Sequence, residues 1–272
     1  MLKTRVLTAL LLLPLVMAAI FALPPQWLMV LLALILLGGS WEYKRLAGFS
    51  DHMAGYLLVL VQAITLVTLF IFKDHWDSGQ LMYMSISCAA WLLMFIRLPL
   101  YRSDADPDST FRTISFFTAI VSITTGWFAI SWLRLQAEGS WLILLLLLIV
   151  WAADTGAYFA GKNFGKNKLA PHISPGKTRE GLFGGLIAAP LVALLAANLM
   201  PLAKFDAIEL ILLSLVTALV SVGGDLMISL HKRTSGFKDS GKLLPGHGGI
   251  LDRVDSLLAA APFFALGVLV TG

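Results

Sequence analysis

The chain has 272 residues and a mass of 29.5 kDa, and 58% of its residues are hydrophobic while only 13% are charged. Soluble domains carry about 25% charged residues, so this composition, with a mean hydropathy of +0.84, excludes a soluble domain and a disordered chain. The single cysteine, Cys88, excludes an internal disulfide and a cysteine-built metal site, and the modest net charge of +4 gives no reason to expect a nucleic-acid partner.

Nine apolar segments follow one another along the chain. A helix that crosses a bilayer needs about 20 mainly apolar residues, and lipid leaves unpaired backbone groups unsatisfied, so such runs should be helical. Barrel strands would alternate at every second residue, which runs such as 144–148 do not. We therefore predict an all-α integral membrane protein with about nine transmembrane helices. The segments lie near residues 6–23, 26–41, 54–72, 79–97, 113–133, 140–160, 181–201, 208–229 and 254–271.

The first segment could also be a secretory signal, but its apolar run is longer than a usual signal core. Pro24 and Pro25 then lead directly into another apolar segment, which favours a retained helix. The basic residues predict the orientation, because all Lys and Arg except Lys73, Arg134 and Lys204 fall in alternate loops beginning with the N-terminus. The positive-inside rule then predicts a cytoplasmic N-terminus and a periplasmic C-terminus.

The chain divides into two regions by its polar content. Residues 1–139 have short or plainly solvated loops and no internal repeat, and we interpret them as scaffold helices that could serve lipid access or dimerisation. Residues 140–272 carry acidic residues inside the apolar segments and two polar loops, 161–180 and 231–253. We expect the function to reside in this second region.

The first polar cluster joins Asp154 to the segment that begins at Ser174. An Asp within a membrane helix costs about 2.5–3.5 kcal/mol, so Asp154 should face a polar cavity; the alternative is a buried hydrogen bond to a neighbouring helix. Lys177 and Thr178 resemble the end of a Walker A loop, but Pro171 stands where that motif needs glycine. Hydroxyls and cations before a helix N-terminus can still hold phosphate. The alternative is an ordinary basic loop that touches lipid headgroups.

The second polar cluster begins on a predicted helix, where Asp225, Ser229 and Lys232 share one face. Asp252 and Asp255 are spaced to share a face of the last helix. Carboxylates that face each other need a cation, and Asp225 and Asp252 could share a magnesium ion that also binds phosphates. The alternative is a purely structural ion pair such as Asp252 with Lys232. The loop between the two helices adds further candidates for substrate binding: Arg233, Lys238, Asp239, His247, Gly248, Gly249 and Arg253.

Residues 229–255 resemble the signature of phosphatidate cytidylyltransferases, also called CDP-diacylglycerol synthases. The matching positions are Ser229, Lys232-Arg233, Lys238-Asp239, Gly241, Leu244-Pro245, His247-Gly248-Gly249, Asp252-Arg253 and Asp255. His231 departs from the signature, because the family usually has an apolar residue there. The segments DTGAYFAG and SPGKTREG upstream are also similar to the family, so the resemblance is specific over about the last 120 residues.

The resemblance implies a bacterial inner-membrane enzyme, active on the cytoplasmic side, that makes CDP-diacylglycerol and pyrophosphate from CTP and phosphatidate with Mg²⁺. It implies an all-helical homodimer of about nine spans, a metal centre at Asp225 and Asp252, and a second cation such as K⁺. Lys232, Arg233 and Lys238 would then act on the phosphates as catalytic residues. Ser174, Lys177 and Thr178 would bind substrate, as would Asp154, Ser229, Asp239, His247, Gly248, Gly249, Arg253 and Asp255.

Three other functions remain open at this point. A non-enzymatic lipid-binding or scaffold protein would need basic loops but not carboxylates within the membrane. A related enzyme could use CTP with another lipid phosphate. An ion-coupled transporter could relay ions through Asp154, Asp225 and Asp255, although no inverted repeat is visible and the polar residues gather at one face of the membrane.

Overall fold

The computed structural model describes residues 2–49, 53–101, 107–202, 205–241, 243 and 248–271, with side chains from Leu10 onward. Each of the nine predicted apolar segments coincides with a helix, and the all-α prediction is confirmed. The long helices are α1 Leu2–Ala22, α2 Pro25–Leu46, α3 Met53–Ile71, α4 Gln80–Phe95, α6 Ser109–Leu135, α7 Gly139–Phe164, α8 Arg179–Leu199, α9 Ala207–Thr234 and α10 Leu251–Thr271. The short elements are η1 Lys73–Ser78, α5 Arg97–Leu100, β1 Lys168–Ala170 and β2 Ser174–Thr178.

Within the described residues, 8 helices are long and apolar enough to cross a bilayer. They are α2, α3, α4 with α5, and α6 to α10; α1 contributes a shorter apolar stretch, Leu10–Ala22. The number of nine spans therefore stays a prediction. Large apolar side chains on α3 and α8, such as Leu60 and Leu195, are exposed as lipid-facing residues would be.

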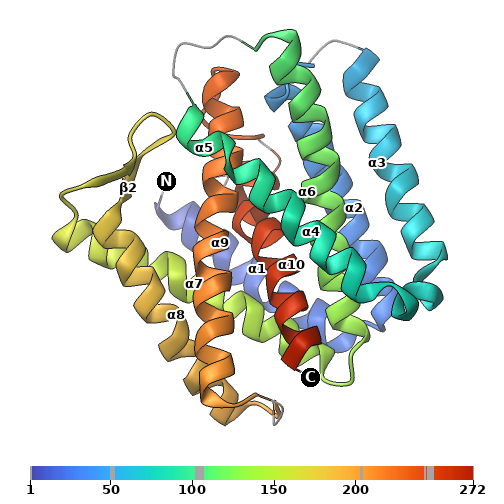
Figure 1. Cartoon of the computed structure of the whole chain (residues 1–272), viewed down its shortest axis with the longest axis vertical. Helices are drawn as coiled ribbons and strands as arrows, with labels where there is room; N and C mark the ends of the chain where they lie inside the picture. The colour runs from blue at the N-terminus through green and yellow to red at the C-terminus, as the bar shows by residue number, and fades with distance from the viewer. Residues whose placement is uncertain are drawn as a thin grey trace.

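The bundle is built around α6 and α10, which lie at its centre (Figure 1). Trp127 of α6 is fully buried, and its indole N–H donates to the carbonyl of Met29 in α2 at 2.9 Å. Trp91 of α4 donates in the same way to Thr125 Oγ1 at 3.1 Å. Buried indole groups need such partners, so these two bonds fix α2 and α4 against the central helix.

Helices α7 and α8 approach each other closely along a line of small residues. A Cβ atom added at Gly156 would lie 2.6 Å from the carbonyl oxygen of Gly184, and one at Gly185 would lie 2.7 Å from that of Ala153. Only glycine leaves room for backbones this close. The two helices therefore form a tightly packed pair.

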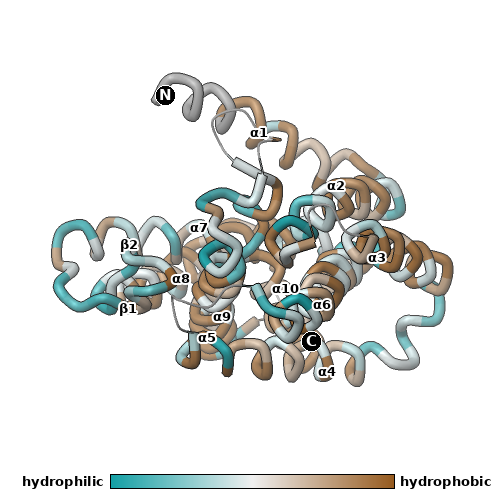
Figure 2. Tube along the Cα trace, turned by 90° about the horizontal axis from the view of Figure 1, so that it is seen from above, coloured by the Kyte–Doolittle hydropathy of each residue, from teal (hydrophilic) through white to brown (hydrophobic). Residues whose placement is uncertain are grey.

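A two-stranded antiparallel hairpin joins α7 to α8, although the sequence analysis expected only a loop there. β1 pairs with β2, and Lys168 lies opposite Thr178. In Figure 2 the hairpin is among the most hydrophilic parts of the chain, whereas the helices are largely hydrophobic. Strands this short fall within a polar loop, where no apolar alternation marks them.

The polar loops gather at one end of the bundle. The hairpin, the end of α2 and the end of α9 lie toward this end, whereas the C-terminus lies at the other (Figure 1). This arrangement agrees with the predicted alternation of basic loops; the orientation relative to a membrane stays a prediction.

Candidate active site

The hairpin brings the first polar cluster to the start of α8. Thr178 is the N-cap of α8, and its Oγ1 accepts a hydrogen bond from the backbone N–H of Gly181 at 3.1 Å. Glu180 in the first turn accepts bonds from the backbone N–H groups of Lys166 and Asn167. These contacts satisfy free amides and tie the hairpin to the helix.

An ion pair joins the two polar clusters that the sequence analysis identified. Lys177 Nζ of β2 lies 2.6 Å from Asp225 Oδ2 of α9. The other carboxylate oxygen of Asp225 accepts a hydrogen bond from Ser229 Oγ at 3.1 Å, one helical turn further on. Arg233 Nε donates to the carbonyl of Ile173 at 3.2 Å and so links the end of α9 to the hairpin. The predicted phosphate cradle and the predicted metal ligand therefore belong to one site.

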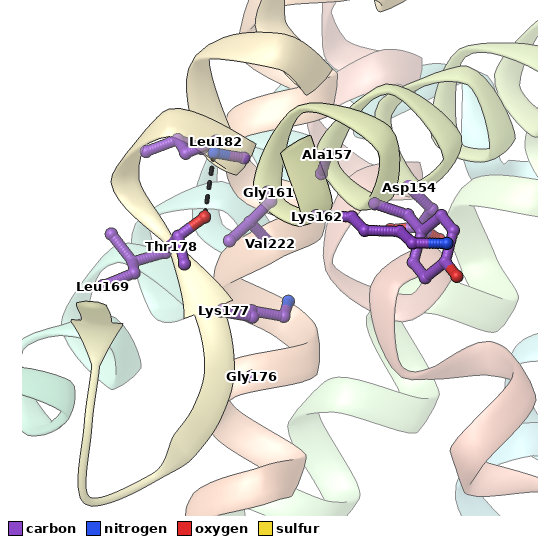
Figure 3. A pocket seen from close by; sticks show the side chains of 12 residues that line it. Asp154, Ala157, Gly161, Lys162, Leu169, Gly176, Lys177, Thr178, Leu182 and Val222 are labelled. Carbon is purple, nitrogen blue, oxygen red and sulfur yellow. Dashed lines mark hydrogen bonds between the residues drawn. The ribbon is translucent and has the colours of Figure 1, made fainter. Parts of the chain in front are cut away.

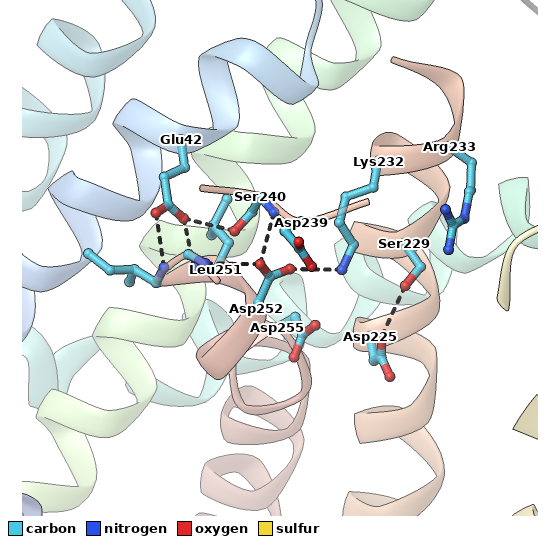
Figure 4. A network of polar contacts seen from close by, with 12 residues as sticks. Glu42, Asp225, Ser229, Lys232, Arg233, Asp239, Ser240, Leu251, Asp252 and Asp255 are labelled. Carbon is cyan, nitrogen blue, oxygen red and sulfur yellow. Dashed lines mark hydrogen bonds and ion pairs between the residues drawn. The ribbon is translucent and has the colours of Figure 1, made fainter. Parts of the chain in front are cut away.

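Asp252 is held by a second ion pair and by backbone amides. Its Oδ1 lies 2.8 Å from Lys232 Nζ, and its Oδ2 accepts bonds from the N–H groups of Ser240 at 2.8 Å and Gly249 at 3.0 Å. The Asp252–Lys232 pair that the sequence analysis kept as a structural alternative is thus present. Asp225, Asp252 and Asp255 approach the space between α9 and α10 (Figure 4).

The carboxylates of this site outnumber its paired lysines. Asp255 is only 8% exposed, and its Oδ1 accepts a bond from the backbone N–H of Ser256 at 2.8 Å. The lysines that interact with Asp255 electrostatically, Lys177 and Lys232, are already paired with Asp225 and Asp252. In these contacts, three carboxyl groups thus share two lysines.

This excess of carboxyl groups over paired lysines is compatible with a bound cation, because carboxylate oxygens are ligands that magnesium prefers. A group of three His, Cys, Asp or Glu side chains in a metal-binding arrangement is absent from the part of the chain that the structure describes. The shared metal at Asp225 and Asp252 therefore stays a prediction.

A cavity of about 340 Å³ lies beside the Lys177–Asp225 pair. It is enclosed by α7, α8, the hairpin and α9, and Lys177 projects toward it from β2 (Figure 3). Asp154 and Lys162 of α7 contribute polar groups, while Leu169 and Val222 are among its apolar residues. Asp154 lines this cavity, as the sequence analysis expected of it, although most of the cavity wall is apolar. A cavity that combines charged and apolar walls suits a ligand with an anionic head and an apolar tail.

The remaining predicted residues that the structure describes do not line the cavity. Lys238, Asp239 and Arg253 are exposed, and Ser174 begins β2. Gly248 adopts a φ of 84°, and a Cβ there would lie 2.7 Å from Asp252 Oδ2, so this position requires glycine for two reasons. His247 falls outside the described residues.

Two residues of the N-terminal region contact this site and were not predicted. Glu42 of α2 accepts a hydrogen bond from Ser240 Oγ at 2.9 Å, and Arg45 donates to the carbonyl of Ser240 at 2.9 Å. The sequence could have indicated Glu42 as a site residue, because it is an acidic residue at the end of an apolar segment. With Lys44 and Arg45 beside it, however, it resembles an ordinary interfacial residue.

The fold and these contacts define a multi-pass membrane protein with a polar, charged site at one end of its bundle. The family model described as "Cytidylyltransferase family" matches residues 3–270. The chain therefore belongs to the cytidylyltransferase family.

Relatives of similar length support this assignment. The chain is 35% identical over 286 residues to the phosphatidate cytidylyltransferase of Haemophilus influenzae, covering 97% of this chain and 98% of that protein. It is 37% identical over 271 residues to the phosphatidate cytidylyltransferase of Pseudomonas aeruginosa, covering 97% and 96%. A Staphylococcus epidermidis protein of the same name is 45% identical over 136 residues, covering 50% of this chain and 52% of that protein.

Proposed function

We propose that this protein transfers the cytidylyl group of CTP to phosphatidate, which yields CDP-diacylglycerol and pyrophosphate for phospholipid biosynthesis. The observation that carries the proposal is the 2.6 Å ion pair between Lys177 and Asp225. This ion pair connects the hairpin that precedes α8 to the carboxylates of α9 and α10, and it lies beside a cavity with an apolar wall. Family membership and the named relatives support the same activity.

The reaction needs positioning and charge neutralisation more than acid–base catalysis. An oxygen of the phosphatidate phosphate attacks the α-phosphorus of CTP and forms a new P–O bond. The bond from the α-phosphorus to the oxygen that bridges it to the β-phosphorus breaks, and pyrophosphate leaves with that electron pair. A phosphate monoester has a second pKa of about 6, so the nucleophile is already anionic near neutral pH. The rate then depends on how well the enzyme holds the phosphate charges.

The polar and basic residues of the site form two groups, one in the hairpin and one near the end of α9. Lys177 and Thr178 of the hairpin line the cavity and, with Ser174 at the start of the same strand, would bind the phosphates of one substrate. Lys232 and Arg233 at the end of α9, and Lys238 in the loop after it, would bind the phosphates that leave as pyrophosphate. Apolar residues of the cavity, such as Leu169 and Val222, would contact the lipid.

Magnesium is the cofactor we propose, with Asp225 and Asp252 as its protein ligands and Asp255 beside them. The three carboxyl groups, which share two paired lysines, support a cation there. When bound, the ion would neutralise charge on the reacting phosphates. A second cation such as K⁺ is part of the same proposal.

The proposed location is the bacterial cytoplasmic membrane, with the site on the cytoplasmic side where CTP is available. The alternate placement of basic loops supports this orientation. We also propose that the protein acts as a homodimer, as the family resemblance implies.

Purified full-length protein in detergent, given α-labelled CTP, phosphatidate and Mg²⁺, tests the activity. We expect label in an organic-extractable lipid with wild type, loss of it with EDTA, and a fall of about 10²–10³-fold in Asp252→Asn. Asp206→Asn is the matched control, because Asp206 caps α9 at the opposite end of that helix. Equal turnover in Asp252→Asn and wild type would contradict the proposed site.

The labelling assay with other lipid phosphates and a separate flux assay in liposomes distinguish the alternatives. Labelling of a different lipid phosphate, with none of phosphatidate, would identify a related cytidylyltransferase. Solute flux into liposomes without nucleotide turnover would indicate a transporter.

A further inference from the structure

Glu42 is a buried acidic residue at the end of α2, in the region for which the sequence analysis expected no chemistry. It is 5% exposed. Its Oε1 accepts the backbone N–H of Ile250 at 3.0 Å, and its Oε2 accepts that of Leu251 at 3.0 Å and the hydroxyl of Ser240 at 2.9 Å. Leu251 is the first residue of α10. The carboxylate thus lies at the positive end of that helix, where an anion is stabilised.

Two glycines allow the chain to close around this carboxylate. A Cβ atom added at Gly241 or Gly249 would collide with the Glu42 side chain. The loop between α9 and α10 therefore contacts Glu42 at two places, at Gly241 and at Gly249. The contact involves residues about 200 positions apart in sequence.

The groups that hold Glu42 are neighbours of those that hold Asp252 (Figure 4). Ser240 donates its hydroxyl to Glu42 and its backbone N–H to Asp252. Gly249 donates its N–H to Asp252, and the next two amides, of Ile250 and Leu251, bind Glu42. The two carboxylates are therefore held by the same two segments of the chain, so a shift of either segment would disturb both.

We propose that Glu42 is a positioning residue, which fixes the start of α10 and the loop at Ser240 so that the Asp252 carboxylate meets the reacting phosphates correctly. This inference rests on the proposed role of Asp252 in cytidylyl transfer. Arg45 supports it from the next turn of α2, because its guanidinium donates to the carbonyls of Asp239 and Ser240. An element of the N-terminal region thus holds the site in place.

The test compares Glu42→Gln and Glu42→Asp in the purified full-length enzyme with CTP, phosphatidate and Mg²⁺. Glu42→Gln keeps the shape but places an amide against backbone N–H donors, so we expect kcat to fall about 10–100-fold, as for residues that orient a ligand. The KM for phosphatidate should change little, because Glu42 contacts no part of the cavity. Glu42→Asp keeps the charge and should recover part of kcat.

A double-mutant cycle distinguishes positioning from general stabilisation. If Glu42 acts through Asp252, adding Glu42→Gln to Asp252→Asn should lower the residual activity by no more than about twofold. Hydrogen exchange at the amides of residues 249–251 should be faster in Glu42→Gln. Glu209→Gln is the matched control, because Glu209 also accepts a backbone N–H at a helix N-terminus, that of α9. It should leave kcat and this exchange unchanged.

The following results would contradict the proposed positioning role of Glu42. A kcat of Glu42→Gln within about twofold of wild type, or a full additive loss in the double mutant, overturns it. Full activity of Asp252→Asn alone overturns the proposed active site first, and this inference with it. If Glu42→Gln does not fold, Ser240→Ala repeats the test, since it removes one donor from Glu42 and keeps the amide that binds Asp252; unchanged kcat there overturns the proposal.

Discussion

The two ion pairs of the site differ in how firmly their carboxylates are held. The side chains of Lys177 and Asp225 are 24% and 27% exposed, and the hydrogen bond that Asp225 accepts from a side chain comes from Ser229. The side chains of Lys232 and Asp252 are 12% and 8% exposed, and two backbone amides also bind Asp252. Side chains change rotamer easily, whereas backbone amides move only with the chain.

This difference suggests that the two halves of the site, the Lys177–Asp225 pair and the Lys232–Asp252 pair, have different roles. If Asp252 acts on the reacting phosphates as proposed, its half of the site would be a fixed reference for placing them. Lys177 lines the cavity, and its pair with Asp225 would be free to rearrange if a substrate's phosphates competed for Lys177. A site of this kind combines preorganisation with room for a bulky lipid to enter.

Lengthening each carboxylate by one methylene group is the strongest test of this comparison. Asp252→Glu keeps the charge but shifts it relative to fixed amides, so we expect kcat to fall about 100-fold. Asp225→Glu meets only adaptable side chains and should lose about tenfold. Steady-state kinetics with both substrates measure the two effects, and an equal loss in both variants would remove the distinction.

Gly248→Ala tests whether the backbone around Asp252 is as rigid as proposed. The methyl group would crowd the Asp252 carboxylate, so we expect kcat to fall about tenfold or more. Gly236→Ala is the matched control, since Gly236 has a similar φ of 73° and a Cβ there meets nothing within 4 Å. Both variants should lose about 1–2 kcal/mol of stability from the left-handed backbone, but only Gly248→Ala should lose activity. Equal kcat in the two would argue against a rigid setting for Asp252.

Removing the cap of α8 should produce the smallest change. Thr178→Ala loses the bond to the Gly181 amide and about 1 kcal/mol of stability, and Thr178→Ser should restore it. Asp108→Ala removes an equivalent cap from α6, where Asp108 accepts the Phe111 amide away from the cavity. Thermal unfolding should show similar losses in both, whereas only Thr178→Ala should raise the KM for a substrate. A raised KM in Asp108→Ala would mean that helix stability alone controls binding.

The helices of this protein could be predicted from sequence because apolar length alone signals a membrane span. Asp154 and Asp225 could be identified as candidate site residues because charged residues inside apolar segments are costly and therefore informative. Lys177 could be identified by its place just before a helix N-terminus, but its contact with Asp225 could not be predicted, because the two lie on separate elements. The short strands at Ser174 escaped prediction because they carry no apolar periodicity. Glu42 escaped it for a different reason: its partners at Ile250 and Leu251 are backbone groups of a distant helix, which no local pattern reveals.

The tight packing of α7 on α8 restricts the route by which a lipid could reach the cavity. A single methyl group at Gly156 or Gly185 already reaches the facing main chain, and an acyl chain is about as wide as a methyl group, so no acyl chain fits between the two helices at these positions. If the cavity binds phosphatidate as proposed, the diacylglycerol tails would enter beside this helix pair and not through it. The contact line of α7 and α8 would then form a closed wall along one side of the lipid.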